Sequence, residues 1–301
     1  MNKMMQYKIF HETVFKYSSS VSFSHNLAKL KPATNDVQTL VEYNLSVEPN
    51  TQNISEYTDY FGNTTVNIFI KEFHEKLYVT ANSIVTIDEE KIKNQLASYE
   101  NIEITLEQLQ EHLQTSLDPN VLFVKQFLFP SELINYPNEQ ILKYAKLSFA
   151  KHTNLYFAVK DFMQRIFEDF EFVSGFSDIS TPISTIFEQK KGVCQDFASL
   201  AISALRAIGI PTRYVSGYIQ TLPPEGKEKL FGADASHAWF SVYLGEYGWV
   251  DFDPTNNKLP NEEYILLGYG RDYNDITPLK GVVHGSGIST LDVRVDVREV
   301  E

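Results

Sequence analysis

The 301-residue chain contains a single cysteine, Cys194, and only two tryptophans. One thiol excludes an intrachain disulfide and a cysteine-rich metal site. Basic residues are also scarce: 26 Lys and Arg stand against 39 Asp and Glu, which gives a formal net charge of -13. Phosphate backbones are bound by clustered cations, and no basic cluster occurs in this sequence. The composition therefore disfavours a nucleic-acid partner and leaves chemistry by one thiol open.

Long apolar runs are missing as well. Polar residues interrupt the first 20 positions, so no signal-peptide core is formed there, and no later run reaches the length of a membrane span. We therefore expect a cytoplasmic protein without membrane contact. Hydrophobic residues make up 43% of the chain, which is long enough to bury a full core in one or two domains.

The first part of the chain has the alternation of apolar and polar residues that is typical of strands. This alternation covers residues 6–10, 38–47, 65–70 and 76–80. Residues 59–63 place Gly and Asn between two such runs, which predicts a turn. We expect a mostly β N-terminal domain over residues 1–88.

The middle of the chain changes to helical spacing, first seen at Leu106, Leu109 and Leu113. Pro130 predicts a break, and Pro137 with Asn138 predicts a helix start. Residues 89–153 are therefore expected to form a helical connecting section. Residues 154–301 would form an α+β domain that includes a last strand near the C-terminus.

One predicted helix of that last domain starts at Cys194. Its apolar residues recur at steps of three and four, and Gly209 with Pro211 ends it. A thiol at a helix N-terminus meets free backbone N–H groups and the positive end of the helix dipole, which favour a thiolate. We expect Cys194 to be a nucleophile, with its own N–H as an oxyanion donor and Gly192 leaving room for a substrate.

A cysteine nucleophile needs an imidazole to carry the proton and a third group to orient that imidazole. His237 opens a predicted strand, residues 245–248 form a turn, and the next strand ends at Asp253 before Pro254. A hairpin of this length brings His237 and Asp253 together. Asp251 lies on the same face two residues earlier, so strand period alone leaves both carboxylates open for the orienting role.

Four segments carry a resemblance to a known family. They are Gly192-Val-Cys-Gln-Asp-Phe-Ala198, residues 206–218, Ser236-His-Ala-Trp239 and Gly248-Trp-Val-Asp-Phe-Asp-Pro-Thr-Asn256. These resemble the core blocks of the bacterial transglutaminase-like superfamily, and residues 7–87 resemble its N-terminal β region. The resemblance implies a papain-like fold in residues 154–301, with Cys194 as nucleophile, His237 as base and Asp253 as the orienting acid. Asp251 is the second choice.

The resemblance implies a thiol-dependent enzyme that acts on peptide or side-chain amides through a thioester, without a cofactor or metal. We favour hydrolysis by a peptidase or amidase, because Asp234 precedes His237 by three residues and no apolar amine tunnel is recognisable. Alternatives are a protein-glutamine transglutaminase and a non-catalytic protein-binding module. A metal site of Cys194, His237 and an Asp is disfavoured, since the sequence has one thiol and no short ligand spacing. The oligomeric state stays open.

Several further residues are candidates for supporting roles. Animal transglutaminases use an upstream Trp as an oxyanion donor, and no Trp precedes Trp239 here. Gln195 or an upstream Tyr would have to replace it. Asp196 is expected to interact with the helix dipole, and Trp239 is either a core residue or a lid over His237. We expect Arg213, Tyr214 and Tyr218 to line or support the cleft, and Arg271 to pair with Asp272 at its rim.

Overall fold

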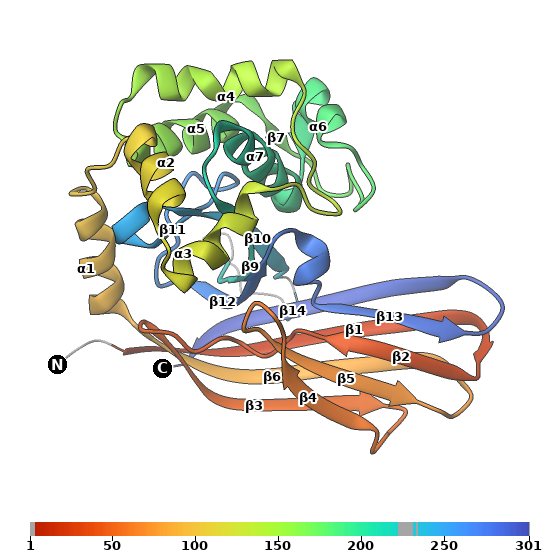
Figure 1. Ribbon diagram of the computed structural model, residues 1–301. Coiled ribbons are helices and arrows are strands. Elements are labelled where there is room, and N and C mark those ends of the chain that lie inside the picture. Colours follow the sequence, from red (N-terminus) through yellow and green to blue (C-terminus); the bar gives the residue numbers. More distant parts are fainter. Residues whose placement is uncertain (1–3, 222–230, 233, 301) are drawn as a thin grey trace, which may run out of the picture.

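The computed structural model describes residues 4–221, 231–232 and 234–300. Its layers are seen in Figure 1, where two β-sheets lie below, a third sheet lies above them, and most helices cover the far side of that third sheet. We call the lower sheets the β region and the third sheet the central sheet. The fold is α+β, as the sequence predicts.

The β region is built from two antiparallel four-stranded sheets, ordered β14-β1-β6-β3 and β13-β2-β5-β4. The first sheet comprises β14 (Ser289–Val300), β1 (Met4–Val21), β6 (His74–Asp88) and β3 (Gln38–Glu48), and the second comprises β13 (Leu279–His284), β2 (Phe23–Ala28), β5 (Thr64–Ile70) and β4 (Ile54–Thr58). The predicted turn at residues 59–63 connects β4 to β5, and Gly62 has a φ of 89° there. That positive φ is the reason for a glycine in the turn.

Strand β6 shows why the two parts of the molecule stay together. Its buried residues alternate, as expected for a strand with one covered face. Leu77 and Val79, near its start, pack in the core between the two sheets. Val85 and Ile87, further along the same face, pack against helix α1 (Glu89–Tyr99) and the central sheet. One strand face therefore contributes to both cores.

The end of the chain returns to the β region, which corrects the expected domain division. Strand β14 pairs with β1 from Gln6↔Val300 to Tyr17↔Ser289, and β13 pairs with β2. The sequence analysis grouped this last segment with residues 154–301. An alternating pattern predicts a strand, but it carries no information about which distant strand is the partner. The N-terminal boundary differs less, since β6 ends at Asp88 and α1 begins at Glu89.

The described α-helices are α1, α2 (Leu106–Thr115), α3 (Pro119–Val124), α4 (Glu139–Lys151), α5 (Leu155–Asp169), α6 (Ile183–Gln189) and α7 (Cys194–Ile208). Helices α1 to α5 begin at side chains that accept hydrogen bonds from free backbone N–H groups, whereas α6 and α7 do not. Thr105 and Gln108 form a capping box at α2, Asn138 caps α4 and Asn154 caps α5. The predicted start at Pro137-Asn138 is confirmed. A short 3-10 turn, Lys125–Leu128, ends before Pro130.

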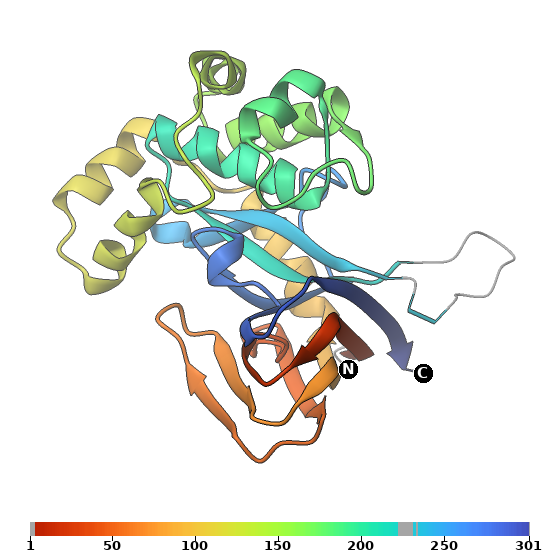
Figure 2. The same cartoon turned by 90° about the vertical axis from the view of Figure 1, so that its right-hand side faces the viewer.

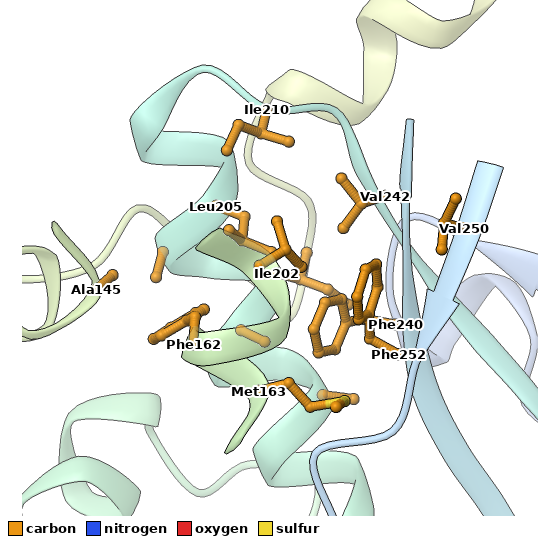
Figure 3. Packing of buried hydrophobic residues seen from close by; sticks show 14 of the residues in the cluster. Ala145, Phe162, Met163, Ile202, Leu205, Ile210, Phe240, Val242, Val250 and Phe252 are labelled. Atoms are coloured by element: carbon orange, nitrogen blue, oxygen red, sulfur yellow. The ribbon is translucent and has the colours of Figure 1, made fainter. Parts of the chain in front are cut away.

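The central sheet is antiparallel with the order β11-β10-β9-β12. Its strands are β11 (Trp249–Phe252), β10 (Ser236–Tyr243), β9 (Thr212–Ile219) and β12 (Tyr264–Gly270). Helix α7 covers one face, where Figure 3 shows Ile202 and Leu205 beside Phe240 and Phe252. Full burial of each such side chain contributes roughly 1.5–3 kcal/mol.

The other face of the central sheet is turned toward the β region and α1 (Figures 1 and 2). Tyr218 and Ile265 pack there against Tyr7 and Ile9 of β1. A two-residue parallel pair, β7 (Glu171–Phe172) with β8 (Lys191–Gly192), leads the chain into α7. The central sheet thus has a helical cover on one side and a β cover on the other. The candidate site is formed by the start of α7, the start of β10 and the end of β11.

Candidate active site

Cys194 is the first residue of α7, as the sequence predicts. The turn before it is held by Asp196, whose Oδ2 accepts hydrogen bonds from the Val193 N–H (2.8 Å) and from the Ser177 hydroxyl. Burial raises the pKa of Asp196, and these two donors oppose that shift. Asp196 therefore fixes the backbone that presents the thiol.

Gly192 makes room for Asp196 and Phe197, and not for a substrate as expected from the sequence. A Cβ at this position would lie 2.9 Å from the Cβ and Oδ2 atoms of Asp196 and 3.1 Å from the Phe197 ring. The space beside Gly192 is thus filled by the chain itself, and the substrate has no access through it. The glycine is needed so that Asp196 can reach back to Val193.

His237 and Asp253 are in direct contact, with His237 Nε2 2.7 Å from Asp253 Oδ2. Both are buried, at 7% and 0% exposed. Burial lowers the pKa of His237, but the Asp253 hydrogen bond and the nearby Cys194 side chain outweigh it and raise this pKa to about 10. The imidazole is accordingly charged at neutral pH. Since Nε2 faces Asp253, Nδ1 is the nitrogen left for the thiol.

The Asp253 carboxylate accepts hydrogen bonds from several directions. Besides His237, the Tyr264 hydroxyl (2.7 Å) and the Asn256 amide (2.6 Å) donate to Oδ2, and the Thr255 N–H (2.9 Å) donates to Oδ1. Burial raises the pKa of Asp253, but the charged His237 and these donors bring it below its usual value. Asp253 is therefore held ionised and in one orientation.

Asp251 makes a different contact from Asp253. Its Oδ2 accepts a hydrogen bond from Trp239 Nε1 at 3.0 Å. Trp239 is 1% exposed, and its ring centroid lies 6.0 Å from that of His237. Trp239 is thus a core residue that also packs against the imidazole, and Asp251 positions the indole.

Sequence analysis missed Tyr264 and Asn256 as partners of Asp253. For Asn256 a local signal existed, because Asp253 starts a turn in which its side chain binds the N–H two residues later. Tyr264 lies on β12, eleven residues beyond Asp253, and nothing in the local sequence indicates that it returns to the carboxylate.

An open depression of about 450 Å³ lies beside the start of α7. Val193 and Gln195, which flank Cys194, line this depression together with residues 177–180. Two tyrosines lie near the thiol on its inner side. Burial and the nearby Cys194 side chain both raise the pKa values of Tyr214 and Tyr273, whose ring centroids are 6.3 Å apart. Tyr273 was not singled out from the sequence.

The remaining expected rim residues are placed elsewhere. The Tyr218 hydroxyl contacts His11 Nδ1 at 2.9 Å, at the boundary with the β region. Arg271 pairs with Asp275 (2.8 Å) and not with Asp272, which accepts hydrogen bonds from the N–H groups of Leu133 and Asn274 instead. Sequence neighbours in an extended segment point apart, whereas the turn at 273–275 folds Asp275 back.

Arg213 also lies away from the thiol, on the β-region side of the central sheet. In the part of the chain that the structure describes, no group of three or more His, Cys, Asp or Glu side chains is arranged to hold a metal ion. Among the same residues, no helix is long and apolar enough to cross a membrane.

The chain belongs to the transglutaminase-like superfamily. Residues 143–254 match the core region of this superfamily, and residues 7–86 match the bacterial transglutaminase-like N-terminal region. The first match contains Cys194, His237 and Asp253. The resemblance found in the sequence is confirmed over both parts.

Full-length relatives occur in mycobacteria. The uncharacterised protein Rv2569c of Mycobacterium tuberculosis is 35% identical over 297 residues, which cover 97% of this chain and 92% of that protein. The uncharacterised protein ML0607 of Mycobacterium leprae is 30% identical, covering 98% and 99%. A protein-glutamine gamma-glutamyltransferase of Pseudomonas aeruginosa is 37% identical over 76 residues, which are 25% of this chain and 11% of that enzyme.

The fold is shared with a solved structure. A candidate cysteine protease of Cytophaga hutchinsonii superposes with a TM-score of 0.74 at 22% identity, covering 99% of this chain and 92% of that one. This likeness shows that the whole architecture, including the β region and the returning C-terminal strands, is one fold.

Proposed function

We propose that the protein is a thiol-dependent acyl-transfer enzyme that cleaves peptide or side-chain amides through Cys194, His237 and Asp253. The observation that carries this proposal is the ordered line from the Asp253 carboxylate through the His237 imidazole to the thiol at the start of α7. A charged imidazole beside a thiol favours the thiolate form, which is the nucleophile.

The first half of the reaction forms a thioester. The Cys194 thiolate attacks the carbonyl carbon of the amide, and the carbonyl electron pair moves to the oxygen. The Cys194 N–H at the helix terminus donates to this oxyanion. As the tetrahedral intermediate collapses, His237 gives its proton to the leaving nitrogen, and the C–N bond breaks. An amine, or ammonia for a side-chain carboxamide, departs and leaves His237 neutral.

The second half returns the enzyme to its starting state. Neutral His237 removes a proton from water, and the resulting hydroxide attacks the thioester carbon. Collapse of the second intermediate breaks the C–S bond and releases a carboxylic acid and the thiolate. Asp253 stays ionised throughout and keeps Nε2 as the hydrogen-bonded nitrogen.

A second oxyanion donor is expected beside the Cys194 N–H. Gln195 lines the open depression, and Tyr214 is a buried hydroxyl close enough to feel the thiolate charge. We favour Tyr214, since a buried donor needs no reorganisation when charge develops on the substrate. Tyr214→Phe would then lower kcat by about ten- to hundredfold, while Gln195→Ala would change it little.

Hydrolysis is favoured over transfer to a second amine. The depression lined by the neighbours of Cys194 is open to solvent, which supports access of water to the thioester. The transfer reaction remains the second candidate, and its support is the 76-residue similarity to the Pseudomonas protein-glutamine gamma-glutamyltransferase. Both reactions share every step before the thioester is resolved.

The proposal is tested first by labelling. Iodoacetamide should modify Cys194 in the folded protein, and peptide mass mapping identifies the site. The alkylation rate at pH 7 should fall at least tenfold in His237→Ala, because the charged partner is lost. An equal rate in both proteins would contradict the ion-pair arrangement.

Turnover is then measured on glutamine-containing peptides and on peptide libraries, with and without a fluorescent primary amine. Release of acid and free amine indicates hydrolysis, and covalent incorporation of the fluorescent amine indicates transfer. Cys194→Ala should lose more than about 10³-fold of either activity. Activity that persists in Cys194→Ala would refute the proposed nucleophile.

A further inference from the structure

A partly open cavity lies on the face of the central sheet that is turned away from α7. It has a volume of about 190 Å³ and is bordered by the loop at residues 35–38, helix α1 and the central sheet. Trp239, Trp249 and Tyr99 form aromatic walls, and Arg213 and Asp251 bring opposite charges to it. Neither Cys194 nor His237 lines this cavity, but Trp239 and Tyr264, which contact His237 and Asp253, line it from the neighbouring active site.

The two charged residues stand in one row across the sheet. Asp251 on β11 is opposite Ser241 on β10, and Ser241 is opposite Arg213 on β9. Residues directly opposite each other share a face of the sheet. With strands about 4.8 Å apart, Ser241 separates the two charged residues by one strand. The two are not within ion-pair distance of each other, so neither neutralises the other directly.

Two atoms in this row are buried without a partner among the described residues, Arg213 Nε and Ser241 Oγ. An unsatisfied buried polar group costs about 1–3 kcal/mol, so such atoms are rare in native structures and call for a physical reason. Here the two atoms occur on directly opposite residues of neighbouring strands. The N–H donor of Arg213 Nε and the hydroxyl of Ser241 are therefore both unused at neighbouring positions of the sheet.

The position of Arg213 leaves only part of its guanidinium group available. Its Cζ lies 4.2 Å from the Trp249 ring centroid and 3.8 Å from the Tyr269 ring centroid. These rings cover the flat faces of the cation, while the N–H groups lie along its edge. A guanidinium presented by its edge matches the two oxygens of a carboxylate.

Asp251 offers the complementary charge. Trp239 Nε1 donates to its Oδ2, and this bond fixes the carboxylate without neutralising it. A phosphate or another dianion in the cavity would be repelled by this carboxylate, and a simple cation would be repelled by Arg213. A molecule that carries both a carboxylate and an ammonium group satisfies both side chains.

We propose that this cavity binds a small amino-carboxylate, of the class of the free amino acids, with its carboxylate on Arg213 and its ammonium group on Asp251. Ser241 stands between the two in the same row of the sheet. The volume of about 190 Å³ is that of roughly six water molecules, which accommodates an amino acid of ordinary size. The aromatic walls cover its side chain.

Binding is measured on the Cys194→Ser protein, so that turnover at the candidate active site cannot contribute. The twenty common L-amino acids are screened by thermal unfolding, because a ligand of the folded state raises the transition temperature. Any hit is titrated by calorimetry, with acetate and methylammonium as probes that carry one charge each. We expect one amino acid bound per chain, and at least tenfold weaker binding of both single-charge probes.

Variants assign the binding to this cavity. Asp251→Asn and Arg213→Met should each weaken the dissociation constant at least tenfold, and Leu96→Phe should do so by filling the cavity from α1. Arg294→Met is the matched control, since Arg294 is an exposed arginine of β14 that pairs with Glu12. If Arg213→Met does not fold, Asp251→Asn and Leu96→Phe still decide the question.

Three results would overturn the proposal. One is that no amino acid in the panel binds the folded protein saturably, so that the cavity holds water only. Another is that acetate binds as tightly as the amino acid, which would mean that Asp251 does not bind the ammonium group. The third is that binding is undiminished in Asp251→Asn and Leu96→Phe, so that the ligand occupies another place. None of these results bears on turnover by Cys194, which is measured separately.

Discussion

Asp251 and Asp253 are two residues apart at the end of one strand, yet their surroundings differ in kind. Asp253 receives hydrogen bonds from the side chains of His237, Asn256 and Tyr264 and from the Thr255 N–H. Asp251 receives one from Trp239 and stands in a row with two unpaired buried atoms. A carboxylate surrounded by donors is fixed and cannot take another partner. A carboxylate beside unused polar atoms is placed to receive one, so the first environment suits orientation and the second suits binding.

The largest expected effect is a difference in kcat between variants of Asp253 and Asp251. Asp253→Asn should lower kcat about a hundredfold or more, because the amide presents the wrong partner to His237 Nε2 and no longer stabilises the imidazolium. Asp251→Asn should lose less than about tenfold. Turnover is measured on a substrate found as described above, with circular dichroism to show that both variants fold. A greater loss in Asp251→Asn would mean that the orienting residue is misassigned by two positions.

Tyr264→Phe tests how much one of the Asp253 donors contributes. The Tyr264 hydroxyl donates to Asp253 Oδ2, which keeps two other donors when it is removed. We expect a stability loss of about 1 kcal/mol in urea unfolding and a three- to tenfold decrease in kcat. Tyr57→Phe, at an exposed tyrosine of β4, is the control and should change neither quantity. Equal behaviour of the two variants would show that Asp253 is held without Tyr264.

The pH dependence of stability tests the charge on His237. Its pKa is raised to about 10 in the folded protein against about 6.5 in the unfolded chain. The stabilising contribution is therefore complete below pH 6.5 and is lost as pH rises from 6.5 to 10, at up to about 1.4 kcal/mol per pH unit. Urea unfolding across this range should show the loss, and His237→Gln should flatten it.

His11 serves as an internal reference, because its pKa is shifted in the opposite direction from that of His237. Burial lowers its pKa to about 4, so the folded protein holds it neutral and stability decreases as pH falls from 6.5 to 4. His237→Gln should leave this acid branch in place. If the variant keeps the alkaline branch of the curve instead, His237 is not the group that titrates there.

The smallest expected effect concerns Ser241. Because its Oγ has no partner among the described residues, Ser241→Ala should leave the free energy of unfolding unchanged or raise it by up to about 1 kcal/mol. Most buried hydroxyl deletions are destabilising, so the sign is informative. A clear loss of stability, above 1 kcal/mol without added ligand, would show that Ser241 is satisfied within the chain and would weaken the contrast with Asp253.

Much of the candidate site was predictable because its signals are local. The start of α7 at Cys194 follows from an apolar stripe and its end at Gly209, which has a φ of 94°. The hairpin that joins β10 to β11 follows from two alternating runs and a turn with Gly245 and Gly248 at positive φ. Strand β10 starts at Ser236, one residue before the predicted start at His237, and β11 ends at Phe252, one residue before the predicted end at Asp253. Short-range pattern and turn chemistry are sufficient for such features.

Other features depend on contacts between distant parts of the chain. The role of Gly192 was misread, because its side-chain space is filled by Asp196 folding back from the helix. The pairing of Arg271 was assigned to the adjacent Asp272, whereas a turn brings Asp275 to it. Strands β2, β4, β12 and β13 were not identified, and β14 was grouped with residues 154–301 although it pairs with β1. Apart from the missed strands, each error concerns a partner and not a residue type.

The sequence by itself determined the family, the helix that carries Cys194 and the hairpin that carries His237 and Asp253, because periodicity, turns and motif spacing act over short distances. The family motif favoured Asp253 over Asp251 as the partner of His237, whereas strand period left both open. Only the tertiary structure gives the contacts that distinguish the two carboxylates, from His237 and Tyr264 to Asp253 and from Trp239 to Asp251. It also decided that the chain ends in the β region and that Arg213, Ser241 and Asp251 share one row. Strand pairing joins residues far apart in sequence, and no local pattern specifies which ones meet.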